Sequence, residues 1–416
     1  MDKQQARHII ETLRAGVPSR EVSSVLMEGQ RGLLSRSRDD LARVAQGESA
    51  ALIVRGDYGE GKSHLLSAIE NTARAEGFAV SSIVLSKETP FNRINKVYEA
   101  AAHAVSANNL PCSGFENILL TLPPRAGATE DIARYAETHL HPKVFDVFRN
   151  YFKEGDDLKR AQLYDDLAGA SLTMADLRAI HRGNFHEAMK MPRRFLIQQD
   201  THDYFRFLSF LLRRTGYKGW VILMDEVELL SKLGIGSRAQ AYINLAALLG
   251  LSKKQPPFLD IYLVLALASP FVRGALLAEG RNDLAKVPEW LSDPRRNRLD
   301  EVPLATATMR SIINDSVPLE PLTEQNIEAI LARLEEYHNL AYGWNGKMDR
   351  AFVRSKALAQ PSNPTRTTIR AALEYLDLLY QYGKPPHIEV RAPDTDSLKE
   401  YSRFEDTEAV EDNTET

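Results

Sequence analysis

One eight-residue segment limits what this chain can fold into more than any other feature. It reads Gly56-Asp57-Tyr58-Gly59-Glu60-Gly61-Lys62-Ser63 and satisfies the P-loop pattern G-x-x-x-x-G-K-[ST]. A short apolar run over 51–54 precedes it and predicts a buried strand, and apolar residues at helical spacing follow it. Its glycines let the backbone turn tightly, so that N–H groups and a helix N-terminus can surround phosphate oxygens. The segment therefore predicts a strand, a loop and a helix that together bind a nucleoside triphosphate.

The chemistry of this loop suggests a role for its polar side chains. Lys62 supplies a positive charge for the β- and γ-phosphates, and the Ser63 hydroxyl is a ligand suited to Mg²⁺. The residues predicted to bind the nucleotide are Gly56, Asp57, Tyr58, Gly59, Glu60, Gly61, Lys62, Ser63 and His64.

Two adjacent acidic residues end a second apolar strand, at 220–226. Asp225 is placed to reach Mg²⁺, through water, at the carboxyl end of that strand. Glu226 is the candidate base that orients and deprotonates an attacking water. Glu228 is open to two interpretations, a hydrogen-bonding partner of this site or a solvated acid at a helix start. The adjacent glutamate favours a hydrolase over a kinase, because a kinase takes its nucleophile from a substrate hydroxyl.

Two further residues are candidates for contacting the γ-phosphate. Ser269 stands at the polar end of the next predicted strand; a turn serine before Pro270 is the alternative. Arg366 follows Thr365, a residue type favoured at helix N-caps, so its guanidinium falls in the first turn of the last helix. There it can contact the γ-phosphate and move with a lid. Arg370, one turn on, is the rival, and an ordinary solvated face is the alternative.

Charge and cysteine content exclude several classes of protein. The 416 residues carry a net charge of −4, so any nucleic-acid contact has to come from a local basic patch. The single cysteine, Cys112, rules out an internal disulfide and a cysteine-based zinc cluster, which fits a reducing cytosol. The longest apolar run, 261–268, is far too short to span a membrane, and the N-terminus is too charged for a signal peptide. We therefore expect a cytoplasmic protein without a membrane segment.

Strands that alternate with helices predict the architecture. Apolar runs over 77–86, 220–226 and 260–269 join the P-loop strand, and helical patterns fill most of 91–215. Such alternation is typical of an α/β fold with a parallel sheet covered by helices on both faces. In these sheets the ligand sits beyond the carboxyl ends of the strands, where the P-loop and the two acids fall. The predicted fold is a parallel-sheet P-loop NTPase core.

The same pattern predicts a division of the chain into regions. Residues 1–45 form an N-terminal helical leader, and 46–320 form the P-loop core. A helical insertion, 112–205, interrupts that core. Residues 321–388 form a C-terminal helical lid. The last stretch, 389–416, is polar and rich in acidic residues, which predicts a disordered tail.

Motifs spread along the chain resemble those of a known class of ATPases. They are LRAGVPSREV (13–22), IVRGDYGEGKSHLL (53–66), GYKGWVILMDEVELL (216–230), LEPLTEQN (319–326) and PTRTTIRAALEYLD (364–377). With its P-loop and DEVE motif, the chain resembles the AAA+ ATPases related to origin-recognition proteins. GDYGEGKSH combined with DEVELL points more narrowly to the ATP-binding proteins of BREX-type phage-defence systems. The resemblance covers roughly two-thirds of the chain.

This resemblance implies cofactors, partners and roles for particular residues. It implies ATP and Mg²⁺, with Asp225 binding the metal and Glu226 acting in hydrolysis. The residues that it implies for nucleotide binding are Gly56, Gly61, Lys62 and Ser63. It also implies other defence-system proteins as partners, such as a helicase or a DNA-modifying enzyme, and a nucleotide-dependent homo-oligomer.

Two departures from the family pattern restrict what the resemblance implies. The separation from Lys62 to Asp225 is far longer than such a core needs, which is the reason for placing an insertion at 112–205. Nothing in the sequence of that insertion assigns it a role. Origin-recognition relatives commonly carry a winged-helix domain after the lid, and here only about thirty residues follow, with acidic residues outnumbering basic ones. Duplex binding through a C-terminal winged helix is therefore not expected.

Local basic clusters leave contact with DNA open. The densest are 190–194 and 295–298, and solvated helix ends and loops are the alternative interpretation. An arginine from a neighbouring subunit commonly completes an AAA+ site by stabilising charge on the transferring phosphoryl group. The candidates for that role are Arg281, Arg295, Arg296 and Arg298, and the sequence does not choose among them.

The leading hypothesis is an AAA+ protein that binds and hydrolyses ATP and couples its nucleotide state to a DNA-directed phage-defence assembly. A nucleotide-gated scaffold or switch with negligible hydrolysis is the alternative. A small-molecule phosphotransferase is a third hypothesis, and the adjacent acids Asp225 and Glu226 speak against it.

Overall fold

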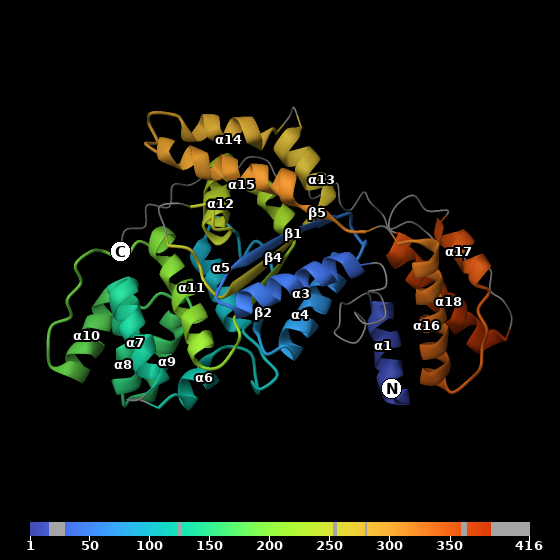
Figure 1. Cartoon of the computed structure of the whole chain (residues 1–416), viewed down its shortest axis with the longest axis horizontal. Coiled ribbons are helices and arrows are strands. Elements are labelled where there is room, and N and C mark those ends of the chain that lie inside the picture. Colours follow the sequence, from blue (N-terminus) through green and yellow to red (C-terminus); the bar gives the residue numbers. More distant parts are fainter. Residues whose placement is uncertain are drawn as a thin grey trace.

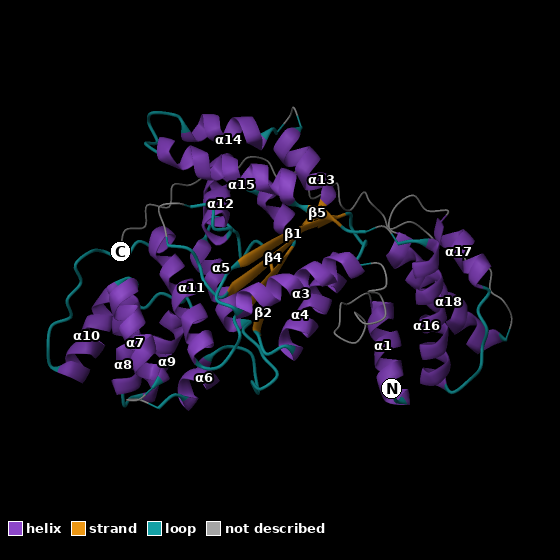
Figure 2. Cartoon of the chain, in the orientation of Figure 1, coloured by secondary structure: helices purple, strands orange, loops and turns teal. Residues whose placement is uncertain are grey.

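A five-stranded, all-parallel sheet forms the centre of the molecule, with the strand order β2-β3-β4-β1-β5 (Figures 1 and 2). The computed structural model describes residues 1–15, 30–123, 127–252, 256–278, 281–320, 322–358 and 364–383. The strands are β1 (Ala50–Gly56), β2 (Ala79–Val84), β3 (Trp220–Asp225), β4 (Ile261–Ala268) and β5 (Val317–Pro318). The sheet confirms the predicted parallel α/β architecture, and β5 is absent from the predicted strands.

Helices cover both faces of this sheet, because its central strands are apolar on both sides. The layers are α3 (Arg31–Ala45) and α4 (Lys62–Ala75) on one face, and α5 (Ile94–His103), α11 (Ile197–Arg214) and α12 (Ile235–Leu248) on the other. Along β1, Leu52 and Val54 pack with α3 and α4, whereas Ile53 packs into the opposite core. Every residue of β3 and β4 is buried. The two layers thus hold the carboxyl ends of the strands at one common edge.

Helices also fill the stretch between β4 and β5, where the sequence predicts no element. They are α13 (Ser269–Phe271), a π-helical turn (Val272–Leu277), α14 (Asp283–Leu291) and α15 (Val302–Asp315). A buried ion pair holds α14 to α12, with Arg238 Nε 3.1 and 2.9 Å from the two carboxylate oxygens of Asp283. The Tyr242 hydroxyl donates to the same carboxylate at 2.8 Å. Pro288 lies inside α14. A proline in a helix interior usually indicates a break, so the sequence pattern does not favour a helix here.

A group of short helices extends the side of the sheet that carries α11 (Figure 1). They are α6 (Glu116–Thr121), α7 (Ala128–His139), α8 (Pro142–Lys153), α9 (Asp157–Leu167) and α10 (Met174–Phe185). Their apolar faces share one core with α5 and α11. Side chains cap three of these helices: His141 accepts an N–H group at the start of α8, Asp156 does so at the start of α9 and Thr173 at the start of α10.

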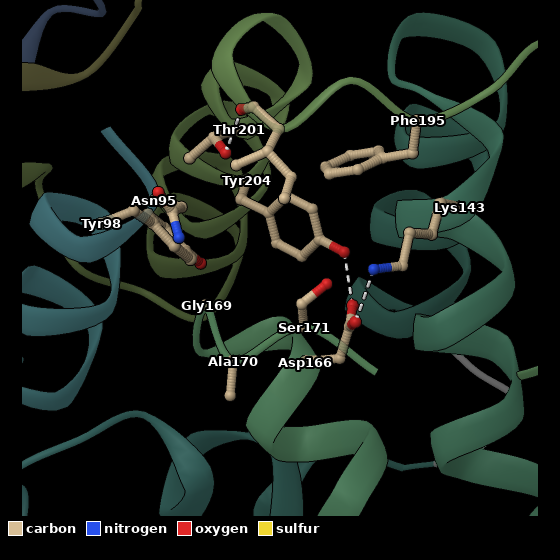
Figure 3. A pocket seen from close by; sticks show the side chains of 11 residues that line it. Asn95, Tyr98, Lys143, Asp166, Gly169, Ala170, Ser171, Phe195, Thr201 and Tyr204 are labelled. Carbon is tan, nitrogen blue, oxygen red and sulfur yellow. Dashed lines mark hydrogen bonds and ion pairs between the residues drawn. The ribbon is translucent and has the colours of Figure 1, made fainter. Parts of the chain in front are cut away.

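A buried carboxylate joins α8 and α9 of the predicted 112–205 insertion to α11, the helix in which that insertion ends (Figure 3). Lys143 Nζ of α8 lies 2.7 Å from Asp166 Oδ2 of α9, and the Tyr204 hydroxyl of α11 donates to Asp166 Oδ1. The Leu172 N–H donates to the same carboxylate at 2.8 Å. A cavity of about 20 Å³ beside this cluster has room for a single water molecule. The earlier helices of the insertion are thus attached to α11, which leads into β3.

Four helices form a separate unit, seen on the right of Figure 1. They are α1 (Lys3–Ala15), α16 (Glu324–Tyr342), α17 (Arg350–Leu358) and α18 (Pro364–Tyr382), and we call them the lid unit. Ile10 of α1 shares an apolar core with Leu331 of α16 and Leu376 of α18. Arg14 donates to both carboxylate oxygens of Asp377 at 2.7 and 2.9 Å. The N-terminal helix therefore packs as part of the lid unit.

The predicted regions map onto this arrangement as follows. Residues 1–45, predicted as one leader, contribute helices to two places, because α1 joins the lid unit and α3 covers the sheet. The connection between these helices, 16–29, lies outside the described residues, and so does the predicted acidic tail, 389–416. In the part of the chain that the structure describes, no helix combines the length and the apolar character needed to cross a bilayer.

Candidate functional site

The P-loop connects the end of β1 to the start of α4 at the carboxyl edge of the sheet. Gly59 and Gly61 have φ values of +82° and +107°, a region that favours glycine. Gly61 is the N-cap of α4, and no side chain among the described residues caps this helix end. His64 lies half-buried in the first turn. The first N–H groups of α4 therefore remain for an anionic ligand, as is typical of helix N-termini that bind phosphate.

Gly56 serves this loop for a different reason from the other two glycines. Its backbone φ is not positive. A Cβ at this position would lie 2.6 Å from Leu319 Cδ1 and 3.1 Å from Glu60 Oε2. Leu319 belongs to the segment that joins β5 to the lid unit, so a glycine lets that segment approach the loop closely. The expected role in tight turning holds for Gly59 and Gly61, and close approach explains Gly56.

Lys62 is held inside the loop. Its Nζ donates to the carbonyl oxygens of Gly56 at 2.9 Å and Asp57 at 3.1 Å, and the residue is buried. The centroid of the Tyr58 ring lies 5.2 Å from Nζ, within range of a cation–π interaction. Glu60 stabilises the turn through two hydrogen bonds to Asp57. Its carboxylate accepts the Asp57 N–H at 2.6 Å, and its own N–H donates to the Asp57 carbonyl at 3.3 Å. The loop is thus organised around its ammonium group.

The P-loop and the acidic strand meet directly. Asp225 ends β3, and Ser63 Oγ donates to Asp225 Oδ2 at 2.5 Å although 162 positions separate the two residues. A hydroxyl and a carboxylate are the protein oxygens that Mg²⁺ takes in P-loop sites together with phosphate oxygens. This pair of oxygen ligands at the start of α4 therefore fits a nucleotide-bound Mg²⁺.

Glu226 begins the turn after β3 with an unusual backbone. Its φ is +61°, a region that residues other than glycine seldom adopt and that clusters at functional sites. Asp225 Oδ1 accepts the Glu226 N–H at 2.9 Å and so stabilises this turn. Burial and the neighbouring Asp225 carboxylate raise the pKa of Glu226. A raised pKa suits a general base, because the base has to hold the proton that it takes.

Glu228 is buried beside these residues. It lies in the 3₁₀ turn Val227–Lys232 and is 6% exposed. Neither of its carboxylate oxygens has a hydrogen-bond partner in the described parts of the chain. Burial raises the pKa of Glu228, and the nearby Glu226 carboxylate adds to the rise. Burial together with the carboxylates of Glu228 and Glu226 raises the pKa of Tyr58 to about 12. The interpretation of Glu228 as a solvated acid is therefore wrong.

The two candidates for the γ-phosphate lie in different parts of the molecule. Ser269 follows β4 directly and is half-buried. Because Ala268 pairs with Gly56 in the register of β4 and β1, Ser269 lies beside the start of the P-loop. Arg366 falls within α18, but its side chain lies outside the described part of the structure. Arg370, its rival on the same helix, is exposed.

Internal contacts hold three of the arginines considered for a neighbouring subunit. Arg281 donates to the Ser231 carbonyl, Arg296 pairs with Asp293, and Arg298 pairs with Glu301. Arg295 is exposed. In the other basic cluster, Arg193 pairs with Asp200 at 2.7 Å, whereas Lys190 and Arg194 are exposed. These contacts give Arg193, Arg296 and Arg298 a place in the structure of their own chain.

Comparison with known protein families supports the predicted resemblance. The family described as BREX system ATP-binding protein BrxC/D matches residues 1–122 and 183–389. The match includes the P-loop and the acidic strand, and it leaves out residues 123–182, which lie inside the predicted insertion. No curated protein and no solved structure matches the chain. Because the matched residues make up most of the chain and include the loop, strand and lid helices described above, the chain belongs to the BrxC/D family of BREX system ATP-binding proteins.

Proposed function

We propose that this chain is an AAA+ ATPase that hydrolyses ATP with Mg²⁺ and couples its nucleotide state to a DNA-directed phage-defence assembly. The 2.5 Å contact between Ser63 Oγ and Asp225 Oδ2 carries the proposal, because it brings the P-loop and the acidic strand to one point. The sheet order supports the AAA+ assignment. That class has a strand inserted between the P-loop strand and the acidic strand, and here β4 lies between β1 and β3. Family membership supports the binding of ATP.

The residues of the chain would divide the work as follows. Lys62 and the first N–H groups of α4 bind the phosphates, while Ser63 and Asp225 hold the metal. Bound Mg²⁺ supplies neutralisation of the charge that develops during phosphoryl transfer. Glu226 takes a proton from the attacking water. The candidate contacts to the γ-phosphate are the Ser269 hydroxyl beside the P-loop and the Arg366 guanidinium from the lid unit.

Two variants test this assignment of roles. Lys62→Ala removes the cation that binds the phosphates, and the affinity for ATP in a calorimetric titration should fall by at least about tenfold. Glu226→Gln preserves the shape of the side chain, so binding should persist while steady-state phosphate release falls by about 10²-fold or more. Turnover retained in the glutamine variant would remove Glu226 from its role. Folded wild-type protein that binds no nucleotide would overturn the whole proposal.

A nucleotide-gated scaffold with negligible hydrolysis is a second candidate, and the internal contacts of Arg281, Arg296 and Arg298 favour it. An arginine supplied to a neighbouring active site is worth about 10³–10⁵ in kcat where one acts. Phosphate release measured with and without duplex DNA separates the two candidates. Tight ATP binding with negligible release under both conditions supports the scaffold, whereas release stimulated by DNA or by an ATP-dependent homo-oligomer supports the ATPase.

A further inference from the structure

The chain passes between the sheet and the lid unit at two places, and one side chain joins them. One passage follows β5 through Leu319 and Glu320, and the other ends at Gln30 before α3. Gln30 Nε2 donates to the Glu320 carbonyl at 2.8 Å, and the Glu320 N–H donates to Gln30 Oε1 at 3.1 Å. The Gln30 side-chain amide thus uses both its NH₂ donor and its oxygen acceptor on the backbone of Glu320. Gln30 and Glu320 are therefore fixed to each other.

Gln30 is the buried side of this junction, and the exposed Glu320 packs closely against α3. Gln30 is 4% exposed, and its carbonyl accepts the Leu34 N–H in the first turn of α3 at 3.0 Å. A Cβ at Gly32 would lie 2.5 Å from Glu320 Oε1, so a glycine lets the Glu320 side chain lie against α3. Removing the Gln30 amide would leave the Glu320 carbonyl and N–H without these two hydrogen bonds.

The same segment touches the P-loop. The Leu319 N–H donates to the Arg55 carbonyl at 2.8 Å. The Leu319 side chain occupies the space beside Gly56, where a Cβ would lie 2.6 Å from Leu319 Cδ1. The Gly56 carbonyl in turn accepts a hydrogen bond from Lys62 Nζ at 2.9 Å. A continuous set of contacts therefore runs from the phosphate-binding lysine to the junction.

Contacts within the lid unit hold its helices together. Thr323 caps α16 soon after the junction, in a capping box with Asn326. The helices α1, α16 and α18 share one apolar core. The ion pair between Arg14 and Asp377 connects α1 to α18 from outside that core. The helices α1, α16 and α18 are therefore packed on one another, and α16 begins at Glu324, close in sequence to Glu320.

We infer that Leu319 and Gln30 are positioning residues that transmit occupancy of the P-loop to the lid unit. This inference rests on the proposed function, because it takes a nucleotide as the ligand of the P-loop. Leu319 would shift with Gly56, against which it packs, and Gln30 would couple Glu320 to the start of α3. The lid unit, which carries Arg366, thereby takes up an orientation that depends on what the P-loop holds.

Crowding and relief at Gly56 test the Leu319 contact. Gly56→Ala adds a methyl group against Leu319, so the affinity for a fluorescent ATP analogue should fall by at least about tenfold. Adding Leu319→Ala opens that space, and the affinity of the double variant should return to within about threefold of that of Leu319→Ala alone. A double variant that binds no better than Gly56→Ala overturns the contact. Leu319→Val repeats the test if the alanine variant unfolds.

Hydrogen exchange measured with and without ATP tests the Gln30 contact. In wild type, ATP should slow exchange in α4, α16 and α18. In Gln30→Ala, protection of α4 should persist, whereas the ATP-dependent protection of α16 and α18 should fall by at least about half. Steady-state assays should show a lowered kcat with KM little changed. Gln46→Ala is the matched control, because Gln46 caps the opposite end of α3.

The outcomes separate this inference from the proposed function. Lid protection that responds to ATP as strongly in Gln30→Ala as in Gln46→Ala overturns the role of Gln30. Wild-type protein that binds no ATP overturns the proposed function itself. Binding in wild type, together with rescue at Gly56 and loss of lid protection in Gln30→Ala, supports both.

Discussion

Two buried carboxylates, Asp166 in the insertion and Glu228 beside the P-loop, lie in opposite surroundings. Asp166 is 2% exposed, and it contacts the Lys143 ammonium at 2.7 Å, the Tyr204 hydroxyl and the Leu172 N–H. Glu228 is 6% exposed and makes no hydrogen bond to any described residue. Burial without partners is unfavourable for a carboxylate, so each such group in a native protein needs a reason. The contrast separates a carboxylate with three partners from a buried one without a hydrogen-bond partner among the described residues.

The regions around these two acids differ in the same way. Beside Asp166, the buried Tyr98 hydroxyl also has a partner, because it donates to the Leu167 carbonyl at 2.7 Å. Beside the P-loop, Glu226 has a positive φ, Glu228 lacks partners and the N-terminus of α4 has no side-chain cap among the described residues. These features lower the stability of the empty site. They also mark the groups that a bound nucleotide and its water can satisfy.

The largest effect should follow from removing the cation that pairs with Asp166. Lys143→Met leaves Asp166 buried without its cation, so the free energy of unfolding should fall by about 3–5 kcal/mol in urea titrations. ATP affinity of the folded variant should stay within about twofold of wild type, because the pair lies outside the P-loop site. Lys159→Met on the exposed side of α9 is the control, with a change below about 0.5 kcal/mol. A loss of stability no larger than that of the control would show that Asp166 does not depend on Lys143.

A smaller effect of opposite sign is expected at the unpartnered carboxylate. Glu228→Met replaces an unsatisfied buried acid with an apolar side chain of similar size, so the free energy of unfolding without nucleotide should rise by about 1–2 kcal/mol. Phosphate release should fall by about tenfold, because the acid is lost from the site. Glu228→Gln keeps a buried polar group and should not gain this stability. Destabilisation by Glu228→Met would mean that the carboxylate has a structural partner in the empty protein.

Local patterns account for the features of the site that sequence alone predicts. The P-loop needs its glycines, Lys62 and Ser63 next to one another, and the acidic strand needs only an apolar run before Asp225 and Glu226. The parallel sheet follows from alternating strands and helices, whose apolar periods are visible within short windows. The burial of Glu228 depends on packing, although Val227 and Leu230 beside it are apolar and buried, which is a sequence signal in its favour.

Contacts between distant segments account for what the sequence does not predict. The apolar stripe of α1 is visible in the sequence, but only the folded chain places Ile10 against the lid helices. Gly56 fits the P-loop pattern, yet its close neighbour is Leu319 from beyond β5. Strand β5 is two residues long, too short for any period to show. The role of the 112–205 insertion stays unpredicted for the same reason, because its partnered groups look like ordinary surface charges until they are buried.

The smallest effect concerns a second buried acid of the insertion, Asp146 on α8. It is 5% exposed, and burial raises its pKa to about 6 even though Arg149 Nε lies 3.1 Å away. His181 and Glu187 also face it; burial lowers the pKa of His181, so Arg149 is the main cation there. Because the folded-state pKa lies above the ordinary value of 3.8, the folded protein keeps a proton between about pH 4 and 6 that the unfolded chain releases. Its contribution to stability should therefore decline as pH rises through this window and level off above it.

Asp146→Asn removes this titration while keeping the shape of the side chain. The difference in the free energy of unfolding between wild type and variant should change by about 1 kcal/mol from pH 4 to pH 7, an amount reduced by solvent screening. Urea titrations at several pH values measure it, and taking the difference cancels the other carboxylates. Equal slopes for the two proteins would show that Asp146 is ionised in the folded insertion throughout this range. Asp146, with the Arg149 cation 3.1 Å away, would then be a partnered carboxylate like Asp166. Glu228 would differ from both in having no partner among the described residues.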